Sequence, residues 1–199
     1  AGEYVAGYAL AATPPANGEL PGVELFTGDI RDAERLAEII NTVRPSRIYH
    51  LAALSHVGRS WDRRGDTLAV NVMGTAALLQ AVTGIGPGLR LLVVSTGQVY
   101  GHVREADMPL KESRVARPTS PYAASKLCTE IVALQAADSG EAEVVVARPF
   151  NFAGPGQAPA FVCSDFARQI ARVELGLAEP RIAVGNLEAR RDFTDVRDT

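Results

Sequence analysis

The stretch LLVVSTGQVYG at Leu91–Gly101 begins with four consecutive apolar residues and continues with small and polar ones. A strand that is apolar on both faces is typical of a parallel sheet with helices on both sides. A second such run, Val144–Ala147, follows a helical stretch at Tyr122–Ala137. This alternation predicts an α/β fold with a doubly wound parallel sheet.

Strand-like and helical runs continue on both sides of this stretch. Further strands are predicted at Tyr4–Leu10, Val23–Thr27, Ile48–Ala53 and Ile182–Val184, and further helices at Thr67–Val82 and Phe161–Leu175. Asp32 is a typical helix N-cap, and the apolar spacing after it predicts a helix that ends before Pro45. The Pro- and Gly-rich stretches Thr13–Gly22 and Gly84–Gly88 are expected to be surface loops.

The composition excludes several classes of protein. Apolar residues make up 47% of the 199 residues, and the net charge is −3, which gives no reason to expect nucleic acid or a membrane as a partner. No apolar run reaches the roughly 18 residues of a membrane helix, and nothing resembles a signal peptide. Cys128 and Cys163 are expected to be buried thiols in a reducing cytoplasm. The spacing of His50, His56 and His102 does not predict a metal site.

A second informative stretch is SPYAASK at Ser120–Lys126. Ser120 suits a helix N-cap, and Pro121 suits the first helical position. Tyr122 and Lys126 are four residues apart and therefore share one helix face. Because a neighbouring ammonium stabilises a phenolate, Lys126 is predicted to lower the pKa of Tyr122. The pair could then act as acid or base toward a hydroxyl or carbonyl.

Small and polar residues follow the ends of the predicted strands. Thr96 follows one apolar run, Arg148–Asn151 (RPFN) follows the other, and Leu51–Ala53 closes a third strand-like run. Ligand sites in parallel sheets lie at the carboxyl ends of the strands, so these residues are predicted to share a site with Tyr122. Thr96 is placed to hydrogen-bond a substrate oxygen.

These motifs together resemble the extended short-chain dehydrogenase/reductases, the NAD-dependent epimerase/dehydratase family. The motifs are GDI-x-D at Gly28–Asp32, HLAA at His50–Ala53, STGQVYG at Ser95–Gly101, SPYAASK at Ser120–Lys126 and RPFN at Arg148–Asn151. The resemblance implies a Rossmann-like fold, NAD or NADP as cofactor, and catalytic roles for Thr96, Tyr122 and Lys126. The cofactor-binding residues that it implies are Asp29, Ile30, Leu51, Ala52, Ala53, Ser95, Tyr122, Lys126 and Pro149.

The second half of the chain resembles the GDP-mannose branch of this family, which contains GDP-mannose 4,6-dehydratases and GDP-4-dehydro-6-deoxy-mannose reductases. The resemblance lies in residues 150–157, 166–171 and 184–193, and in residues 56–58 and 60. Arg168 and Arg191 suit a diphosphate, although the pattern favours a solvated or salt-bridged side chain for either arginine considered alone. The predicted substrate-binding residues are His56, Val57, Thr96, Gln98, Tyr122, Asn151, Arg168, Val184 and Arg191.

The identity of residue 98, a glutamine, bears on whether the protein catalyses reduction or dehydration. Dehydratases of this family carry Glu two residues after the catalytic Thr, where it removes a proton during water loss, and an amide has no usable basicity near neutral pH. The sequence therefore favours NAD(P)H-dependent reduction of the 4-keto group of GDP-4-dehydro-6-deoxy-D-mannose to a GDP-deoxyhexose. The alternatives are GDP-mannose 4,6-dehydration or another nucleotide-sugar reaction, and a truncated non-catalytic nucleotide-binding module.

The family's first strand and its glycine-rich turn are not found in the sequence. That turn holds the pyrophosphate at a helix N-terminus, and Gly84-x-Gly86-x-Gly88 precedes a strand instead of following one. Residues 1–150 are therefore expected to be an incomplete dinucleotide-binding domain, and residues 151–199 the start of a substrate-binding region. The resemblance, together with apolar residues along the helix after Tyr122, indicates a homodimer through a four-helix contact. These apolar residues are Leu127, Ile131 and Leu134.

Overall fold

The computed structural model describes residues 4–10, 22–85 and 88–199. The described residues up to Pro149 form one compact unit, and Phe150–Thr199 form a second. The first unit holds two parallel sheets, and the second holds a smaller strand pair.

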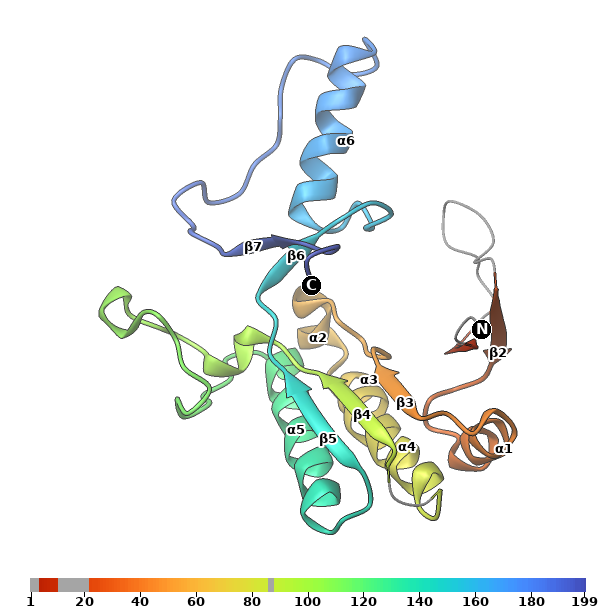
Figure 1. The fold of residues 1–199 in the computed structure, drawn as a ribbon. Helices are drawn as coiled ribbons and strands as arrows, with labels where there is room; N and C mark the ends of the chain where they lie inside the picture. Colours follow the sequence, from red (N-terminus) through yellow and green to blue (C-terminus); the bar gives the residue numbers. More distant parts are fainter. Residues whose placement is uncertain (1–3, 11–21, 86–87) are drawn as a thin grey trace. The chain divides into compact units, whose positions relative to one another are not determined.

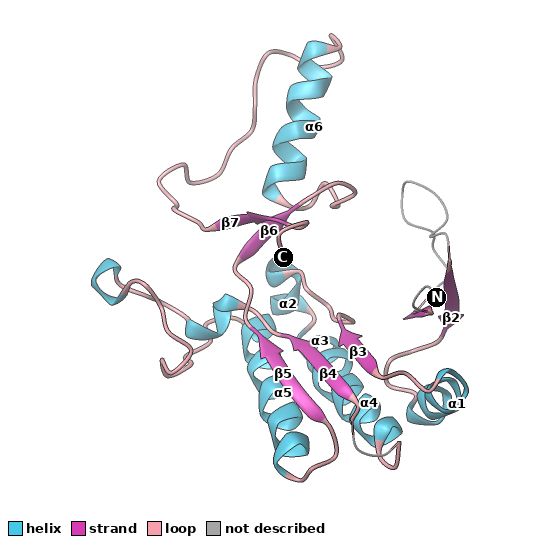
Figure 2. Cartoon of the chain, viewed as in Figure 1, coloured by secondary structure: helices cyan, strands magenta, loops and turns pink. Residues whose placement is uncertain are grey.

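The described strands of the first unit all run parallel to their partners (Figures 1 and 2). β1 (Val5–Ala9) pairs with β2 (Val23–Thr27). β3 (Arg47–His50), β4 (Arg90–Val94) and β5 (Glu143–Ala147) form a second sheet with β4 in the centre. The apolar runs LLVV and VVVA are thus the neighbouring strands β4 and β5, and the predicted parallel α/β fold is confirmed.

Local sequence signals set the ends of the helices. The helical elements of the first unit are α1 (Ala33–Val43), α2 (Val57–Asp62), α3 (Arg64–Leu68), the π-helical turn η1 (Ala69–Met73), α4 (Gly74–Val82), the 3₁₀ turns η2 (Gly97–Tyr100) and η3 (Glu105–Asp107), and α5 (Pro121–Asp138). Asp32 caps α1 by accepting a hydrogen bond from the N–H of Arg35 at 3.0 Å. Ser120 caps α5 by accepting one from the N–H of Ala123 at 3.1 Å. Both caps satisfy backbone donors that a first helical turn leaves free.

The helix predicted at Thr67–Val82 forms, but its middle is the π-helical turn η1. Asn71 lies in this turn and is 1% exposed. Its side chain accepts a hydrogen bond from the N–H of Leu54 at 2.7 Å and donates to Ser125 Oγ at 2.9 Å. The π turn therefore carries a polar side chain that joins the chain after β3 to α5, and such turns are frequent at functional sites.

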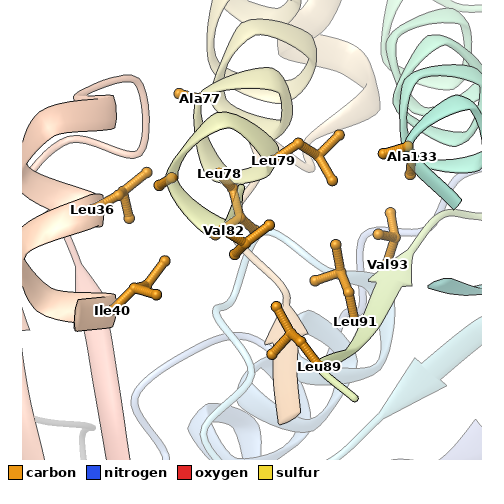
Figure 3. Packing of buried hydrophobic residues seen from close by; sticks show 12 residues of the cluster. Leu36, Ile40, Ala77, Leu78, Leu79, Val82, Leu89, Leu91, Val93 and Ala133 are labelled. Atoms are coloured by element: carbon orange, nitrogen blue, oxygen red, sulfur yellow. The ribbon is translucent and has the colours of Figure 1, made fainter. Parts of the chain in front are cut away.

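The core of the first unit lies between the central sheet and two helices. Figure 3 shows Leu91 and Val93 of β4 beside Val82 of α4 and Ala133 of α5, all at most 1% exposed. Leu36 and Ile40 of α1 belong to the same cluster. Burial of each large apolar side chain contributes about 1.5–3 kcal/mol. On the opposite face Tyr49 and Val145 are 63% and 62% exposed, so the described helices cover one face of this sheet more fully than the other.

The second unit contains β6 (Asn151–Ala153), α6 (Val162–Glu174) and β7 (Phe193–Asp195). β6 and β7 pair in parallel. The helix predicted at Phe161–Leu175 is confirmed, but the strand predicted at Ile182–Val184 is wrong. There the N–H and C=O of Ala183 bond to the side-chain amide of Gln169, at 2.7 and 3.2 Å, which satisfies the backbone without a neighbouring strand.

The prediction of buried cysteines is also wrong. Cys128 and Cys163 are both free thiols, but both are exposed; the residues that α5 buries are others, and no described residue of α6 is buried. The loop predicted at Thr13–Gly22 lies outside the described residues except for Gly22, and residues 86–87 of the loop at Gly84–Gly88 are likewise outside them. Over the described parts of the chain, no helix combines the length and the apolar character needed to cross a membrane.

His50 ends β3 and is buried beneath α4. Its Nε2 lies 2.8 Å from Thr75 Oγ1. Burial, and secondly the charge of Lys126, lower the pKa of His50 from 6.5 to about 4. Because this folded-state pKa lies below the ordinary value, the unfolded chain binds the additional proton first as the pH falls. His50 therefore contributes stability that is present above pH 6.5 and is lost toward pH 4.

We predict that the free energy of unfolding falls by up to about 3 kcal/mol between pH 6.5 and pH 4 because of His50 alone. His50→Gln removes the titrating group and should flatten this part of the profile. Urea unfolding at pH 7, 5 and 4 measures the effect, with His102→Gln at an exposed histidine as the control. A His50→Gln profile parallel to that of the wild type would contradict the prediction.

Candidate active site

Thr96 lies directly after the central strand β4 and caps the turn η2. The residue is 8% exposed, and its Oγ1 accepts a hydrogen bond from the N–H of Gln98 at 3.3 Å. The N–H of the next residue, Gly97, donates to the carbonyl of Pro149 at 2.7 Å. Thr96 is therefore held at the carboxyl end of β4, at the edge where parallel sheets bind ligands.

Tyr122 and Lys126 lie on the first turns of α5 and are 9% and 3% exposed. The backbone N–H of Tyr122 donates to Ser60 Oγ of α2 at 3.2 Å, and the Ser60 hydroxyl donates to the carbonyl of Val57 at 2.6 Å. The hydroxyl of Thr96 is close enough to the phenol of Tyr122 to lower its pKa. The structure thus brings the predicted tyrosine and threonine together, with the predicted lysine one turn along the same helix.

The electrostatics of this pair differ from the sequence-based prediction. Burial raises the pKa of Tyr122, and the hydrogen bond from Thr96 offsets this only in part. The expected lowering by Lys126 is not found, because burial of the phenol is the largest cause of the shift and Lys126 is not among its causes. Burial lowers the pKa of Lys126 from 10.5 to about 8, and the charge of Glu130 opposes this decrease. Lys126 is still mostly protonated at neutral pH, but it lies closer to releasing its proton than an exposed lysine does.

Of the predicted cofactor-binding residues, those after β3 are accessible, whereas those after β2 already contact other side chains. Leu51 is 69% exposed, and Ala52 and Ala53 are half-buried at the end of β3, so this strand end is accessible. Asp29 and Ile30 follow β2. The carboxylate of Asp29 accepts three hydrogen bonds from Arg31, which holds its pKa at about 2, and the side chain of Ile30 packs against Gly74 of α4.

Ser95 and Pro149 have structural partners as well. The hydroxyl of Ser95 donates to the buried carboxylate of Glu130, and the carbonyl of Pro149 accepts the hydrogen bond from Gly97. Both residues therefore help to fix the strand ends. Their predicted contact with a cofactor stays a prediction.

The predicted substrate residues of the first unit surround α2 and η2. His56 caps α2, because its Nδ1 accepts a hydrogen bond from the N–H of Arg59 at 3.2 Å, and Val57 is the first residue of that helix. The side chain of Gln98 is exposed beside Thr96. The Ser60 hydroxyl of α2 also accepts a hydrogen bond from the start of α5, so α2 and α5 are joined by hydrogen bonding close to Tyr122.

The other predicted substrate residues lie in the second unit. Asn151 donates to the carbonyl of Asp192 at 3.0 Å, which joins β6 to the segment before β7. Arg168 pairs with Asp165 at 2.9 Å, and Arg191 donates to the carbonyl of Arg190. Val184 is 48% exposed. Their contribution to the site of the first unit stays a prediction.

Three residues that support the site were missed or given no role in the sequence analysis, namely Ser60, Asn71 and Glu130, while Arg148 was named there only as part of the RPFN motif. Glu130 follows Tyr122 and Lys126 at the same spacing of four residues, and this signal could have been found. Asn71 is fixed by a π turn, which regular helical spacing does not predict. No group of His, Cys, Asp and Glu side chains within the described ranges could hold a metal ion.

Residues 10–199 match the sequence profile of the family described as GDP-mannose 4,6 dehydratase. The GDP-6-deoxy-D-mannose reductase of Pseudomonas aeruginosa is 43% identical over 154 residues, which are 77% of this chain and 51% of that protein. The GDP-mannose 4,6 dehydratase of Homo sapiens is 35% identical over 178 residues, which are 88% of this chain and 47% of that protein. The chain thus spans about half the length of these curated relatives.

Solved structures of similar proteins align with most of this chain. The structure of RMD from Pseudomonas aeruginosa complexed with NADPH aligns with a TM-score of 0.84 and 34% identity, over 98% of this chain and 68% of that chain. The UDP-glucose 4-epimerase of Thermotoga maritima with UDP-glucose aligns with a TM-score of 0.85 and 26% identity, over 99% of this chain and 63% of that chain.

The buried ammonium of Lys126 gives a prediction for stability. Its folded-state pKa of about 8 lies below the ordinary 10.5, so the native state binds fewer protons between these values and stability rises with pH there. Below pH 8, burial of the charged ammonium lowers the free energy of unfolding by its full amount, about 3 kcal/mol. Lys126→Met should therefore be more stable than the wild type at pH 7, with an advantage that shrinks from pH 8 to pH 10.5.

Chemical denaturation at pH 7 and at pH 10 measures this difference. Lys111→Met, at an exposed lysine, is the matched control and should give no such gain. If Lys126→Met is less stable than the wild type at pH 7, the claim that the buried ammonium destabilises the fold is wrong.

Proposed function

Because the chain belongs to the GDP-mannose 4,6-dehydratase family within the extended short-chain dehydrogenase/reductases, we propose that the protein is an NAD(P)H-dependent reductase. Its proposed substrate is GDP-4-dehydro-6-deoxy-D-mannose, and the proposed reaction is reduction of the 4-keto group to a GDP-deoxyhexose.

Gln98 is the observation that carries this choice of reaction. It lies two residues after Thr96, where dehydratases carry the Glu that removes a proton, and its backbone N–H is bonded to Thr96 Oγ1 at 3.3 Å. The carboxamide cannot act as a base near neutral pH. The 43% identity to a GDP-6-deoxy-D-mannose reductase supports the same choice.

The proposed roles use the side chains at the end of β4 and the start of α5. Thr96 would donate a hydrogen bond to the carbonyl oxygen as charge develops there, where a fixed donor helps most. Tyr122, which Thr96 contacts, would supply the proton, and Lys126 would hold positive charge close to the phenol. The raised pKa of Tyr122 keeps the phenol protonated at neutral pH, as a proton donor requires.

The residues around β3 fit a nicotinamide cofactor, whose reduced form would supply the hydride. Ala52 and Ala53 offer backbone without bulky side chains, and the ammonium of Lys126 could donate to ribose hydroxyls. Asp29 is paired with Arg31, but its side chain is 34% exposed, so the carboxylate stays accessible to a ligand. NAD and NADP both remain compatible with these residues.

The second unit is proposed to bind the nucleotide part of the substrate. Asn151, Arg168 and Arg191 would contact the diphosphate and so orient the sugar. Arg168 is now paired with Asp165, but its side chain is 55% exposed. Such exposed pairs contribute at most about 1 kcal/mol, so a diphosphate could replace Asp165 as the partner of the guanidinium.

We predict that the complete protein reduces GDP-4-dehydro-6-deoxy-D-mannose but does not convert GDP-mannose into the 4-keto sugar. Tyr122→Phe should lower kcat by roughly 10²–10⁴-fold while leaving cofactor binding nearly unchanged, because it removes only the proton donor. Gln98→Glu restores a carboxylate base and should allow some water loss from GDP-mannose.

Chromatography of the sugar nucleotides, together with NAD(P)H absorbance, follows both reactions. Efficient water loss from GDP-mannose by the wild type would instead favour the dehydratase alternative, which the family match and the 35% identity to a human dehydratase also support.

A homodimer through α5 is proposed from its exposed apolar face. Ile131 and Leu134 are 60% and 46% exposed on that helix, and the thiol of Cys128 lies beside them. Ile131→Glu should convert the complete protein from dimer to monomer, because it puts a charge into the contact. Sedimentation at micromolar concentration measures this, with Arg59→Glu on α2 as control. A wild-type protein that sediments as a monomer would disprove the dimer.

A further inference from the structure

Glu130 is a carboxylate with almost no exposed surface, on the same helix as the proposed proton donor. Tyr122, Lys126 and Glu130 follow one another at intervals of four residues on α5, so they share one helix face. Glu130 is 2% exposed. A buried carboxylate is costly unless it is paired and hydrogen-bonded, so its partners indicate what it does.

Arg148 is the first partner. Its Nη2 donates to Glu130 Oε2 at 2.6 Å, and its Nε lies 3.0 and 3.1 Å from the two carboxylate oxygens. The same guanidinium stacks on the ring of Tyr100, 5.1 Å from its centroid, and donates to the Tyr100 hydroxyl and to the carbonyl of Glu112. The ion pair raises the pKa of Arg148. Glu130 thereby joins α5 to the end of β5 and to η2.

Ser95 is the second partner, and it lies next to Thr96. Its hydroxyl donates to Glu130 Oε1, and its N–H donates to the carbonyl of Ala147 at 2.7 Å. The end of β4 is thus bonded on one side to β5 and on the other side to α5. These two bonds hold Ser95, the residue next to Thr96, against both β5 and α5.

We propose that Glu130 is a positioning residue for the site: it fixes Thr96 through Ser95, and it places a negative charge one helical turn from the ammonium of Lys126. This inference rests on the proposed reductase function for its kinetic consequences. The effect of Glu130 on the titration of Lys126 does not depend on which reaction the protein catalyses.

The ionisable groups around Lys126 are few. Within the described residues, the buried polar and charged side chains are otherwise Ser, Thr and Asn, with His50 of β3, Lys126 and Glu130 as the exceptions. Tyr122 on the same helix, Tyr100 of η2 and Arg148 after β5 are further ionisable groups on this side of the unit. His50 is neutral at pH 7, so Glu130 is the negative charge that supports the ammonium.

A purely structural ion pair is the competing explanation. Glu130 and Arg148 could serve only to join α5 to β5, and a buried pair of this kind is weak evidence for any further role. The two explanations differ in one measurable quantity, the titration of Lys126. A structural pair affects folding and the general level of activity, whereas a charge acting on Lys126 also shifts the pH at which Lys126 loses its proton.

Glu130→Gln in the complete protein separates these explanations, because the amide keeps the shape of the side chain but not its charge. The ¹³Cε resonance of Lys126 reports its titration in labelled protein and is assigned with Lys126→Arg. We expect its midpoint to move to lower pH, on the order of one pH unit. If the midpoint falls by that amount from about 8, kcat at pH 8 falls about five-fold beyond any loss at pH 6.

Three variants complete the comparison. Ser95→Ala removes the contact to Glu130 but not the charge, so kcat should fall equally at pH 6 and pH 8 while the Lys126 midpoint stays unchanged. Glu130→Asp keeps the charge with a shorter reach, so the midpoint should stay near that of the wild type; this variant also serves if Glu130→Gln does not fold. Glu143→Gln breaks the exposed pair with Arg90 and should change neither quantity.

An unchanged Lys126 midpoint in Glu130→Gln, or an equal shift in Glu143→Gln, would overturn the proposed charge effect. Equal activity of Ser95→Ala and wild type would overturn the fixing of Thr96. If the wild type reduces no 4-keto sugar nucleotide but the midpoint still shifts, the reductase function fails and the action of Glu130 on Lys126 stands.

Discussion

The buried polar face of α5 is the constraint on which the first unit depends. Two elements and the segment after β5 bond to this helix, through Ser60 of α2 at Tyr122, Asn71 of η1 at Ser125 and Arg148 at Glu130. A buried polar group left without a partner costs about 1–3 kcal/mol, so any shift of α5 would break several such bonds together. The described buried side-chain nitrogen and oxygen atoms all have partners. This constraint fixes Tyr122 and Lys126 because they belong to the same helix.

The sequence predicts those parts of the fold that depend on local chemistry. Ser120 and Pro121 mark the start of α5 because a cap and a proline act within one helical turn. The runs at Leu91–Val94 and Val144–Ala147 identify neighbouring strands, since both are apolar throughout. The pairing of β6 with β7 was not predicted, because residues 151–153 meet residues 193–195 by contacts that leave no local pattern.

Burial explains why the pKa shifts at the site were predicted less well than the positions of its side chains. The spacing of Tyr122 and Lys126 correctly places both on one helix, but it does not reveal that both are buried. Burial disfavours the phenolate and the ammonium alike, so the pKa of the tyrosine rises and that of the lysine falls. Glu130 was missed although its spacing places it on the same helix face, because a glutamate on a helix is usually exposed and the sequence does not show that this one is buried.

The burial that destabilises Lys126 is also what would let one carboxylate control it. Opposite charges interact more strongly where water is excluded, so Glu130 acts on a buried ammonium more effectively than it would on an exposed one. With a pKa of about 8, Lys126 is mostly protonated at neutral pH, yet one lost charge nearby would change that state substantially. An exposed lysine, protonated throughout this range, would gain nothing from such a neighbour. The cost in stability and the sensitivity of the proposed site therefore have the same physical origin.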